Sequence, residues 1–194
     1  MKTRIAAACG AALAALGATA AQAAPTFFAG TGHYYEYISV ALTQPAAFTA
    51  ADAATLSGHD GYLVTITSQD EQDFLTDLVS DSNNGGHVLY WTAGVFDSVD
   101  GRWEWGAGPE AGQALSYTNW NAGEPNGNAG EPALIANWSG DRWNDWNAGE
   151  GRGYVVEFSP TNAVPEPGAW ALMIVGFGAA GAMVRRRRSW LAAA

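Results

Sequence analysis

The chain has 194 residues, and its 48% of hydrophobic residues is enough for a folded core, which excludes a wholly disordered protein. Its formal net charge of −10 at pH 7 excludes a nucleic-acid-binding protein, because neutralising phosphates requires clustered Lys and Arg. The only cysteine, Cys9, lies in an N-terminal segment that we expect to be removed, so the remaining domain must be stabilised without a disulfide.

The first 23 residues have the pattern of a secretory signal peptide. Lys2 and Arg4 precede an apolar run, and the tripeptide AQA at 21–23 ends it with small residues. A charged start, an apolar centre and a small-x-small end are typical of export signals, whereas the run is short and Ala-rich for a membrane anchor. We therefore expect residues 1–23 to be cleaved and the rest to be exported.

Two helices are predicted early in the exported part. The Ala-rich segment 45–57 predicts a short helix that starts at Thr49. A second helix is predicted to begin at about Ser68, because Ser68 and Glu71 have the spacing of a capping box and apolar residues follow at helical spacing. The sequence NNGG at 83–86 predicts the turn that ends it.

Short strands make up the rest of the prediction. Runs rich in β-branched and aromatic residues predict strands at 33–40, 61–68, 87–96, 102–105, 133–138 and 153–158. Asp100-Gly101 predicts a hairpin, after which alternation puts Trp103 and Trp105 on one face. The stretch 106–130 lacks periodicity, and loops this long are usually functional. Two helices followed by short strands predict an α+β fold.

The last thirty residues contain four parts in a fixed order. Pro165, Glu166 and Pro167 precede an uncharged segment at 168–184, which is near the lower length limit for a membrane helix. A basic cluster follows it, which would hold that side in the cytoplasm; it consists of Arg185, Arg186, Arg187 and Arg188. A plain C-terminal membrane anchor is one interpretation of these parts.

This order of parts resembles the PEP-CTERM sorting signal of Gram-negative bacteria. The resemblance implies recognition by an exosortase-type membrane protease, removal of the tail, and release to the cell surface or a polysaccharide matrix. We therefore divide the chain into a signal peptide (1–23), a globular domain (25–160), a linker with the PEP motif (161–167), a transmembrane segment (168–184) and a basic cytoplasmic tail (185–194). Contact with the membrane is expected only through that tail, before processing.

The globular region is strongly acidic. Three of the nine basic residues lie in it, namely Arg102, Arg142 and Arg152, against eighteen of the nineteen acidic residues, which leaves a net charge of −15. An anionic polysaccharide would be repelled by this surface unless divalent cations intervene.

Five oxygen-bearing side chains in the last third of the globular region suit calcium, which prefers carboxylate and amide oxygens. They are Glu124, Asn126, Glu131, Asn144 and Asp145. Three carboxylates supply charge, and two amides add ligands without adding repulsion. Neighbours in a regular strand point to opposite faces, so Asn144 and Asp145 can both bind one ion only if that strand is irregular or a backbone carbonyl contributes.

The order of several motifs over about 130 residues resembles a C-type lectin-like domain: an early helix pair, WTAG at 91–94, DGRWEW at 100–105, YTNWNAGEPNG at 117–127, RWND at 142–145 and GYVVEF at 153–158. The resemblance implies a double-looped α+β fold whose long loop holds a calcium and sugar site. Two departures stand out. The disulfides usual in that family are missing, with Val156 at a common cysteine position, and Gly127 stands where many sugar-binding members have Asp.

The resemblance assigns roles to these residues. It implies a cis bond between Glu124 and Pro125, and calcium that also binds two vicinal sugar hydroxyls. Glu-Pro-Asn goes with mannose-, glucose- or fucose-type geometry, whereas Gln-Pro-Asp goes with galactose. The expected sugar-binding residues are Glu124, Asn126, Glu131, Asn144 and Trp146, the last by stacking. Trp120, Trp138 and Trp143 are expected in the core, and the three histidines are expected to be structural or at the surface.

Several functions remain open at this point. The main prediction is an exported calcium-dependent carbohydrate-binding protein in the exopolysaccharide matrix. The alternative is a structural or protein-interaction module of the same fold, with calcium bound for stability or not at all. GEPNG could also be only a turn, since Pro, Asn and Gly favour turns. An enzyme using Glu124 and Glu131 as an acid–base pair is not expected, because the sequence offers no nucleophile motif beside them.

Overall fold

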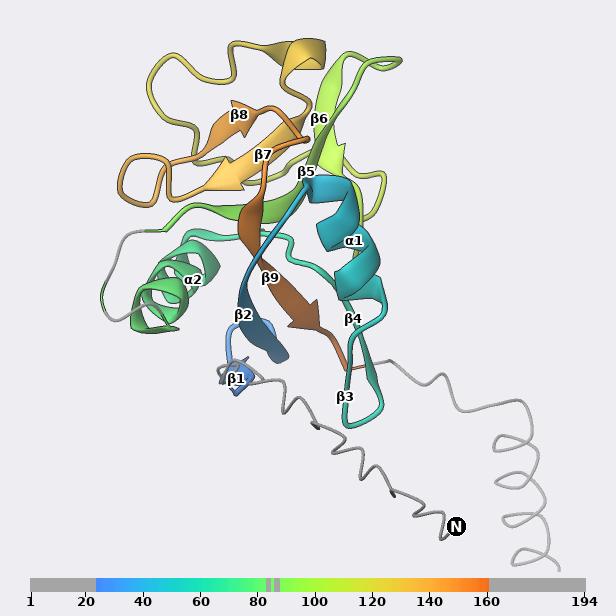
Figure 1. The fold of residues 1–194 in the computed structure, drawn as a ribbon, viewed down its shortest axis with the longest axis vertical. Coiled ribbons are helices and arrows are strands. Elements are labelled where there is room, and N and C mark those ends of the chain that lie inside the picture. The colour runs from blue at the N-terminus through green and yellow to red at the C-terminus, as the bar shows by residue number, and fades with distance from the viewer. Residues whose placement is uncertain (1–23, 83–84, 86–87, 161–194) are drawn as a thin grey trace, which may run out of the picture.

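A computed structural model describes residues 24–82, 85 and 88–160. In these residues short strands and two α helices alternate, followed by a long loop region and three late strands (Figure 1). The elements are β1 (Thr26–Phe28), β2 (His33–Leu42), α1 (Gln44–Asp52), β3 (Thr55–Leu56), β4 (His59–Leu63), α2 (Gln69–Ser82), β5 (Tyr90–Asp97), β6 (Arg102–Trp105), the 3-10 turn η1 (Asn128–Gly130), β7 (Ala133–Ala136), β8 (Asn144–Trp146) and β9 (Arg152–Phe158).

One mixed sheet connects the two ends of the described chain. Its strands follow the order β1-β2-β9-β5-β7-β8, with β4 also on β9 and β6 also on β5. The pairing is antiparallel except between β5 and β9, which run parallel. Figure 1 shows α1 and α2 on either side of β2 and β9, with β5 to β8 and the long loop beyond them. The α+β prediction is confirmed. The long loop lies at the end of the sheet that β7 and β8 form.

The first helix begins earlier than predicted. Thr43 is its N-cap, with the Thr43 hydroxyl accepting from the amide of Ala46, and Pro45 lies in the first turn. Thr49 is inside the helix, where its hydroxyl donates to the carbonyl of Pro45 at 3.1 Å. The predicted start at Thr49 is therefore wrong, because Thr43-Gln44-Pro45 provides both the cap and the fixed φ that suit a helix start.

The second helix begins where predicted, but its cap differs in one bond. The Ser68 hydroxyl accepts from the amide of Glu71 at 3.2 Å, as an N-cap should. The Glu71 carboxylate does not return to Ser68. Instead Glu71 Oε2 accepts from the amide of Thr67 at 2.7 Å and from its hydroxyl at 3.0 Å. Glu71 is 1% exposed, so this capping residue points into the protein.

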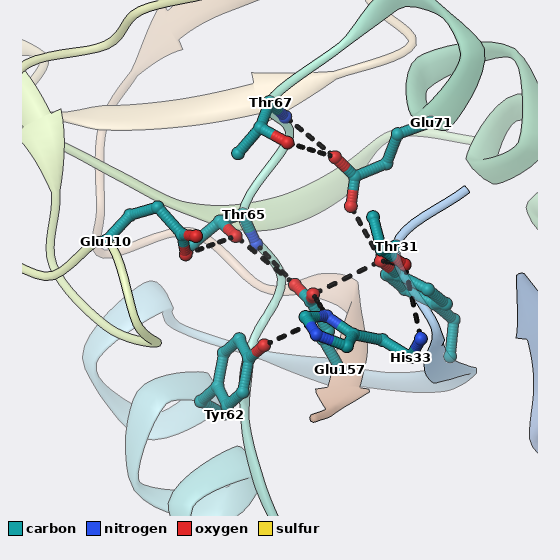
Figure 2. Close-up of polar contacts among 9 residues, drawn as sticks. Thr31, His33, Tyr62, Thr65, Thr67, Glu71, Glu110 and Glu157 are labelled. Atoms are coloured by element: carbon teal, nitrogen blue, oxygen red, sulfur yellow. Dashed lines mark hydrogen bonds and ion pairs between the residues drawn. The ribbon is translucent and has the colours of Figure 1, made fainter. Parts of the chain in front are cut away.

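Buried polar groups join α2 to the last strand, and we call them the Glu71–Glu157 cluster (Figure 2). The Tyr35 hydroxyl lies 2.7 Å from Glu71 Oε1 and 3.1 Å from Glu157 Oε1. His33 Nδ1 lies 2.6 Å from the same Glu157 oxygen, and the Thr65 amide donates to Glu157 Oε2 at 3.1 Å. The cluster ties β2, α2 and β9 together, so it stabilises a domain that has no disulfide.

Tryptophans dominate the core near the late strands. Trp91, Trp105 and Trp143 are among the largest fully buried side chains. Trp143 makes edge-to-face contacts with Trp105, at 6.2 Å between centroids, and with Trp120, at 5.7 Å. Trp143 therefore belongs to the core, as predicted, and it fixes the segment on which the candidate site is built.

Most predicted strands are present, but the short strands β1, β3 and β8 were missed. At two or three residues each, they are too short to show an alternating pattern. No helix in the described part of the chain is long and apolar enough to cross a membrane. The predicted signal peptide, the predicted transmembrane segment at 168–184 and the arginine cluster all lie outside the described residues.

Candidate functional site

A backbone bridge holds the long loop over β8. The Trp143 amide donates to the carbonyl of Asn119 at 2.8 Å, and the Asn121 amide donates to the carbonyl of Trp143 at 2.9 Å, around a parallel bridge between Trp120 and Trp143. The Glu124 amide then donates to the carbonyl of Asn121, which closes a turn. Glu-Pro-Asn is thus brought next to the Asn-Asp pair, although about twenty residues separate them in sequence.

Helix α2 contacts Trp143, one of the two residues of this bridge. The Trp143 indole N–H donates to Gln72 Oε1 at 2.5 Å, and Gln72 Nε2 donates to the Thr76 hydroxyl at 3.1 Å. Gln72 and Trp143 are both completely buried. The capping box and the spacing of apolar residues predict only that a helix forms here. The contact between Gln72 and Trp143 was not predicted, because no local sequence pattern shows which buried group a Gln in a helix will meet.

Asp145 binds the loop directly. Its carboxylate accepts from the Asn126 amide at 3.1 and 3.0 Å and from the Gly127 amide at 2.6 Å. The Asp145 side chain is 0% exposed, so these bonds replace the water that a carboxylate would otherwise hold. Asp145 and the backbone of 126–127 are therefore in direct contact, as a shared site requires.

Glu124 completes this side of the site. The peptide bond between Glu124 and Pro125 is cis, as the family resemblance implied. Asn126 Nδ2 donates to Glu124 Oε2 at 2.5 Å. Partial burial, followed by the nearby carboxylates of Asp145 and Glu131, raises the pKa of Glu124. Three negative side chains therefore act on one another here, and a divalent cation would relieve their repulsion.

Glu131 packs against the loop at Gly127. A Cβ atom added to Gly127 would lie 2.7 Å from Glu131 Cβ and would overlap its carboxylate. Gly127 therefore leaves the space in which Glu131 lies beside the Glu-Pro-Asn turn. The glycine that the sequence marked as a departure from the family thus has a steric reason in this chain.

This packing gives a testable expectation for Gly127→Ala. The added methyl group would displace the Glu131 carboxylate from the site, so calcium affinity measured by isothermal titration calorimetry should fall about tenfold, as when a supporting contact of a metal ligand is lost. Gly130→Ala is the matched control, because a Cβ added there meets nothing within 4 Å. Equal affinities in the two variants would show that the position of Glu131 does not matter.

Asn144 is near these groups in sequence but makes no contact with them that the structure records. The Asn144 Oδ1 atom is buried and has no hydrogen-bond partner. Strand β8 pairs regularly with β7, so Asn144 and Asp145 point to opposite faces. A single ion could therefore take both side chains only through rearrangement of β8 or with help from a backbone carbonyl. The unpartnered Asn144 Oδ1 is nonetheless an oxygen of the kind that calcium accepts as a ligand.

The donor set fits calcium in chemistry but is not preassembled. Within 24–82, 85 and 88–160, no three His, Cys, Asp or Glu side chains form a group that could hold a metal by themselves. The carboxylates that meet must therefore be supplemented by amide or backbone oxygens, which calcium accepts readily. The structure brings together Glu124, Asn126, Glu131 and Asp145, and it leaves Asn144 on the opposite face of β8.

Two tryptophans differ from the prediction. Trp146 is half-buried and contacts two groups, the Trp138 ring at 5.0 Å between centroids and the Arg152 guanidinium at 5.7 Å. Its indole nitrogen is buried without a partner. Trp138, which was expected in the core, is instead the exposed indole, at 36%. The core expectation for Trp138 is therefore wrong, because the chain turns outward after Asn137, whose φ is +61°.

Comparison with known families decides the fold family. The model of the Lectin C-type domain matches residues 44–158, which is more than half of the chain. This chain belongs to the C-type lectin domain family. A second model, the PEP-CTERM protein-sorting motif, matches residues 163–188 and so supports export with surface association. Both resemblances inferred from the sequence are confirmed.

Similar proteins occur widely. Halomucin of Haloquadratum walsbyi is 31% identical over 138 residues, 66% of this chain but 1% of halomucin. The mouse low affinity immunoglobulin epsilon Fc receptor is 37% identical over 86 residues, 44% of this chain and 23% of the receptor. Human lithostathine-1-beta is 27% identical over 66% of this chain and 76% of its own length. The lectin domain thus spans only a small part of the first two relatives.

Solved structures share the fold. Human lithostathine has a TM-score of 0.59 at 18% identity, over 70% of this chain and 88% of its own. The C-type lectin CEL-I of Cucumaria echinata has a TM-score of 0.56 at 21% identity, over 66% and 90%. The cow CD23 carbohydrate-recognition domain, solved in the presence of a GlcNAc2Man3 oligosaccharide, has a TM-score of 0.51 at 28% identity, over 66% and 89%.

Proposed function

We propose that this lectin domain is a calcium-dependent carbohydrate-binding module of mannose or glucose type, exported and held at the cell surface or in an exopolysaccharide matrix. The observation that supports it most is the convergence of Glu124, Asn126 and Asp145 through direct hydrogen bonds, beside Glu131. The CD23 domain solved with a mannose-containing oligosaccharide supports the sugar class. The sorting motif at 163–188 supports the location.

The residues divide the work of binding by their chemistry. Glu124, Glu131 and Asp145 would supply the negative charge that holds calcium, and Asn126 and Asn144 would add amide oxygens. When bound, the ion would supply open coordination positions for two vicinal hydroxyls of the sugar. Asn126 donates and Glu124 accepts in the hydrogen bond between them. The Glu124 carboxylate has further lone pairs, and the Asn126 amide has a second N–H, so Glu124 could accept from one sugar hydroxyl and Asn126 could donate to another.

A structural module is the second candidate, and one observation favours it. Asp145 is already satisfied by the amides of Asn126 and Gly127, so the loop has bonds to hold it without an ion. A calcium-dependent antifreeze protein, solved in its calcium-free form, shares the fold at a TM-score of 0.57 and 19% identity. We favour sugar binding over an enzyme, because the carboxylates lie among amide donors with no nucleophile beside them.

The deciding experiment uses the double variant Glu124→Gln with Asn126→Asp. The chain without its signal peptide is applied to an array of mannosides, glucosides and galactosides at millimolar calcium and again with a chelator. We expect wild-type binding to mannose or glucose ligands that the chelator abolishes, and a shift toward galactosides in the variant. Absence of chelator-sensitive binding to any sugar would contradict the proposal and favour the structural module.

A further inference from the structure

We propose that the linker segment 164–167, which carries the PEP motif, docks on the lectin domain beside the end of β9, with the Pro165 ring in a small cavity that we call the exit pocket. The exit pocket is lined by residues of β2, of the β3–β4 hairpin and of the chain before β1, namely Pro25, Tyr34, Leu56, Ser57 and His59. The contact involves neither calcium nor sugar, so it goes beyond the function proposed above.

The position of the exit pocket is the first reason. Strand β9 ends at Phe158, which pairs with Tyr34 of β2 on one side and with Gly61 of β4 on the other. The same register, continued by two residues, puts His59 of β4 opposite Pro160. The rings of Tyr34 and His59 stack at 6.4 Å between centroids. These two rings therefore meet where the chain leaves the sheet toward the sorting motif at 163–188.

The segment can reach the pocket, which is the second reason. The described residues end at Pro160, five residues before Pro165, and five extended residues span up to about 17 Å. Neighbouring strands lie about 4.8 Å apart, so β2 and β4, which both pair with β9, are well within that span. A tether this short gives an effective concentration of about millimolar, so even a weak contact is populated.

The size and lining of the pocket are the third reason. Its volume is about 170 Å³, below the roughly 300–1,000 Å³ of pockets for drug-sized ligands, so it suits one side chain better than a saccharide chain. Proline-rich segments dock on aromatic-lined grooves, because they are already extended and lose little entropy on binding. Val164 and Glu166 each precede a proline, which favours an extended backbone through 164–167.

The charge of the pocket is the fourth reason. Glu166 would be repelled by much of this acidic surface; the cavity between α2 and β1, for example, is lined by Asp77 and Asp81. The exit pocket has no carboxylate in its lining. It contains His59, whose Nδ1 atom is buried and has no hydrogen-bond partner among the described residues. Buried polar atoms are nearly always paired, and the docked segment brings a donor in the amide of Glu166, the one N–H between its two prolines.

Docking would control how the sorting motif is presented. Figure 1 shows the ends of β1, β3 and β9 on the side of the domain away from β8 and the long loop, so the contact leaves the candidate calcium site free. A motif held in the exit pocket is not free to enter a protease. The exosortase-type protease that the motif implies therefore has to compete with the pocket for it.

Engineered cysteines test the contact, because the chain without its signal peptide has none. Ser57→Cys is combined with Val164→Cys in the chain with its C-terminal segment, purified in detergent, and disulfide formation in air is followed on non-reducing gels. Asp52→Cys with Val164→Cys is the matched control, because Asp52 is exposed at the end of α1, which packs on Gly61 beside the end of β9. We expect the first pair to react about tenfold faster, and Pro165→Ala to reduce its rate to that of the control.

The remaining outcomes are equally definite. Equal rates in the two pairs, or a rate that Pro165→Ala leaves unchanged, would overturn the docking. Disulfides that form between two chains and not within one would also overturn it, since they would assign the pocket to a second copy. Thr161→Ala, a change in the linker before the motif, should leave the rate unchanged. Because neither calcium nor sugar enters the measurement, failure of this inference leaves the carbohydrate-binding proposal standing.

Discussion

Asp145→Ala should be among the most destabilising single substitutions in this lectin domain, by about 2–4 kcal/mol. The Asp145 carboxylate is completely buried and accepts from the amides of Asn126 and Gly127. Removing it leaves two backbone donors without their partner, and each unsatisfied buried donor costs about 1–3 kcal/mol. Urea unfolding in the presence of a chelator measures this cost without any contribution from calcium.

The control for Asp145→Ala is a carboxylate that makes only a surface ion pair. Asp100 lies 3.2 Å from Arg102 and both side chains are about half exposed, so Asp100→Ala should change the free energy of unfolding by less than about 1 kcal/mol. Both substitutions remove one negative charge from the same acidic domain. If they destabilised it equally, the bonds between Asp145 and the loop would have no special role in holding the site.

Asp145→Asn separates stability from calcium binding. An amide of the same shape keeps one oxygen for the loop amides but removes the charge, so stability should be recovered in part. Calcium affinity should stay low, because the set of carboxylates falls from three to two. A variant that regained calcium affinity together with stability would show that Asp145 acts on the ion only through the loop.

The sequence was sufficient for the fold family because its motifs are local. Glu-Pro-Asn, Trp-Asn-Asp and the cap at Ser68 can each be read within a few residues, and their order identified a C-type lectin domain. The four side chains that converge at the loop also belong to these motifs or follow them closely in the chain. The sequence could not give the regular pairing of β8, which puts Asn144 on the face opposite Asp145, because strand register depends on the partner strand.

Side-chain environments were the least predictable part. Trp138 and Trp146 differ in exposure in a way opposite to expectation, since one left-handed residue, Asn137, decides where the hairpin turns. Glu71 had the spacing of a capping box, but its carboxylate is directed inward to Tyr35 and Thr67. The Glu71 carboxylate meets Tyr35, and Asn137 is held by the Thr76 hydroxyl and the carbonyl of Val88. These contacts join residues distant in sequence, so no local pattern predicts them.

Glu71→Gln should favour the folded domain more at pH 8 than at pH 5. Burial, followed by the charge of Glu157, raises the pKa of Glu71 above its ordinary 4.5. The Tyr35 hydroxyl has one hydrogen but lies within hydrogen-bond distance of an oxygen of both carboxylates, so only a protonated carboxyl can complete the second bond. Glutamine, which is always neutral, supplies that donor at every pH.

The sign follows from proton binding. A group whose pKa is raised by folding binds more protons in the folded state, so its contribution to stability is present below its unfolded pKa and is lost as the pH rises through its folded pKa. For Glu71 the loss begins above pH 4.5. For His33, whose pKa is raised chiefly by its hydrogen bond with Glu157, the loss occurs above pH 6.5. Both groups therefore make the wild type less stable as the pH rises from 5 to 8.

Urea midpoints at pH 5, 6, 7 and 8 provide the measurement. We expect wild-type stability to decline across this range, and the advantage of Glu71→Gln over the wild type to grow from pH 5 to pH 8. Asp100→Asn controls for the loss of one charge and should follow the wild type at every pH. A Glu71→Gln variant that was less stable than the wild type at pH 8 would contradict this prediction. It would mean that the Glu71–Glu157 cluster needs the Glu71 carboxylate in its ionised form.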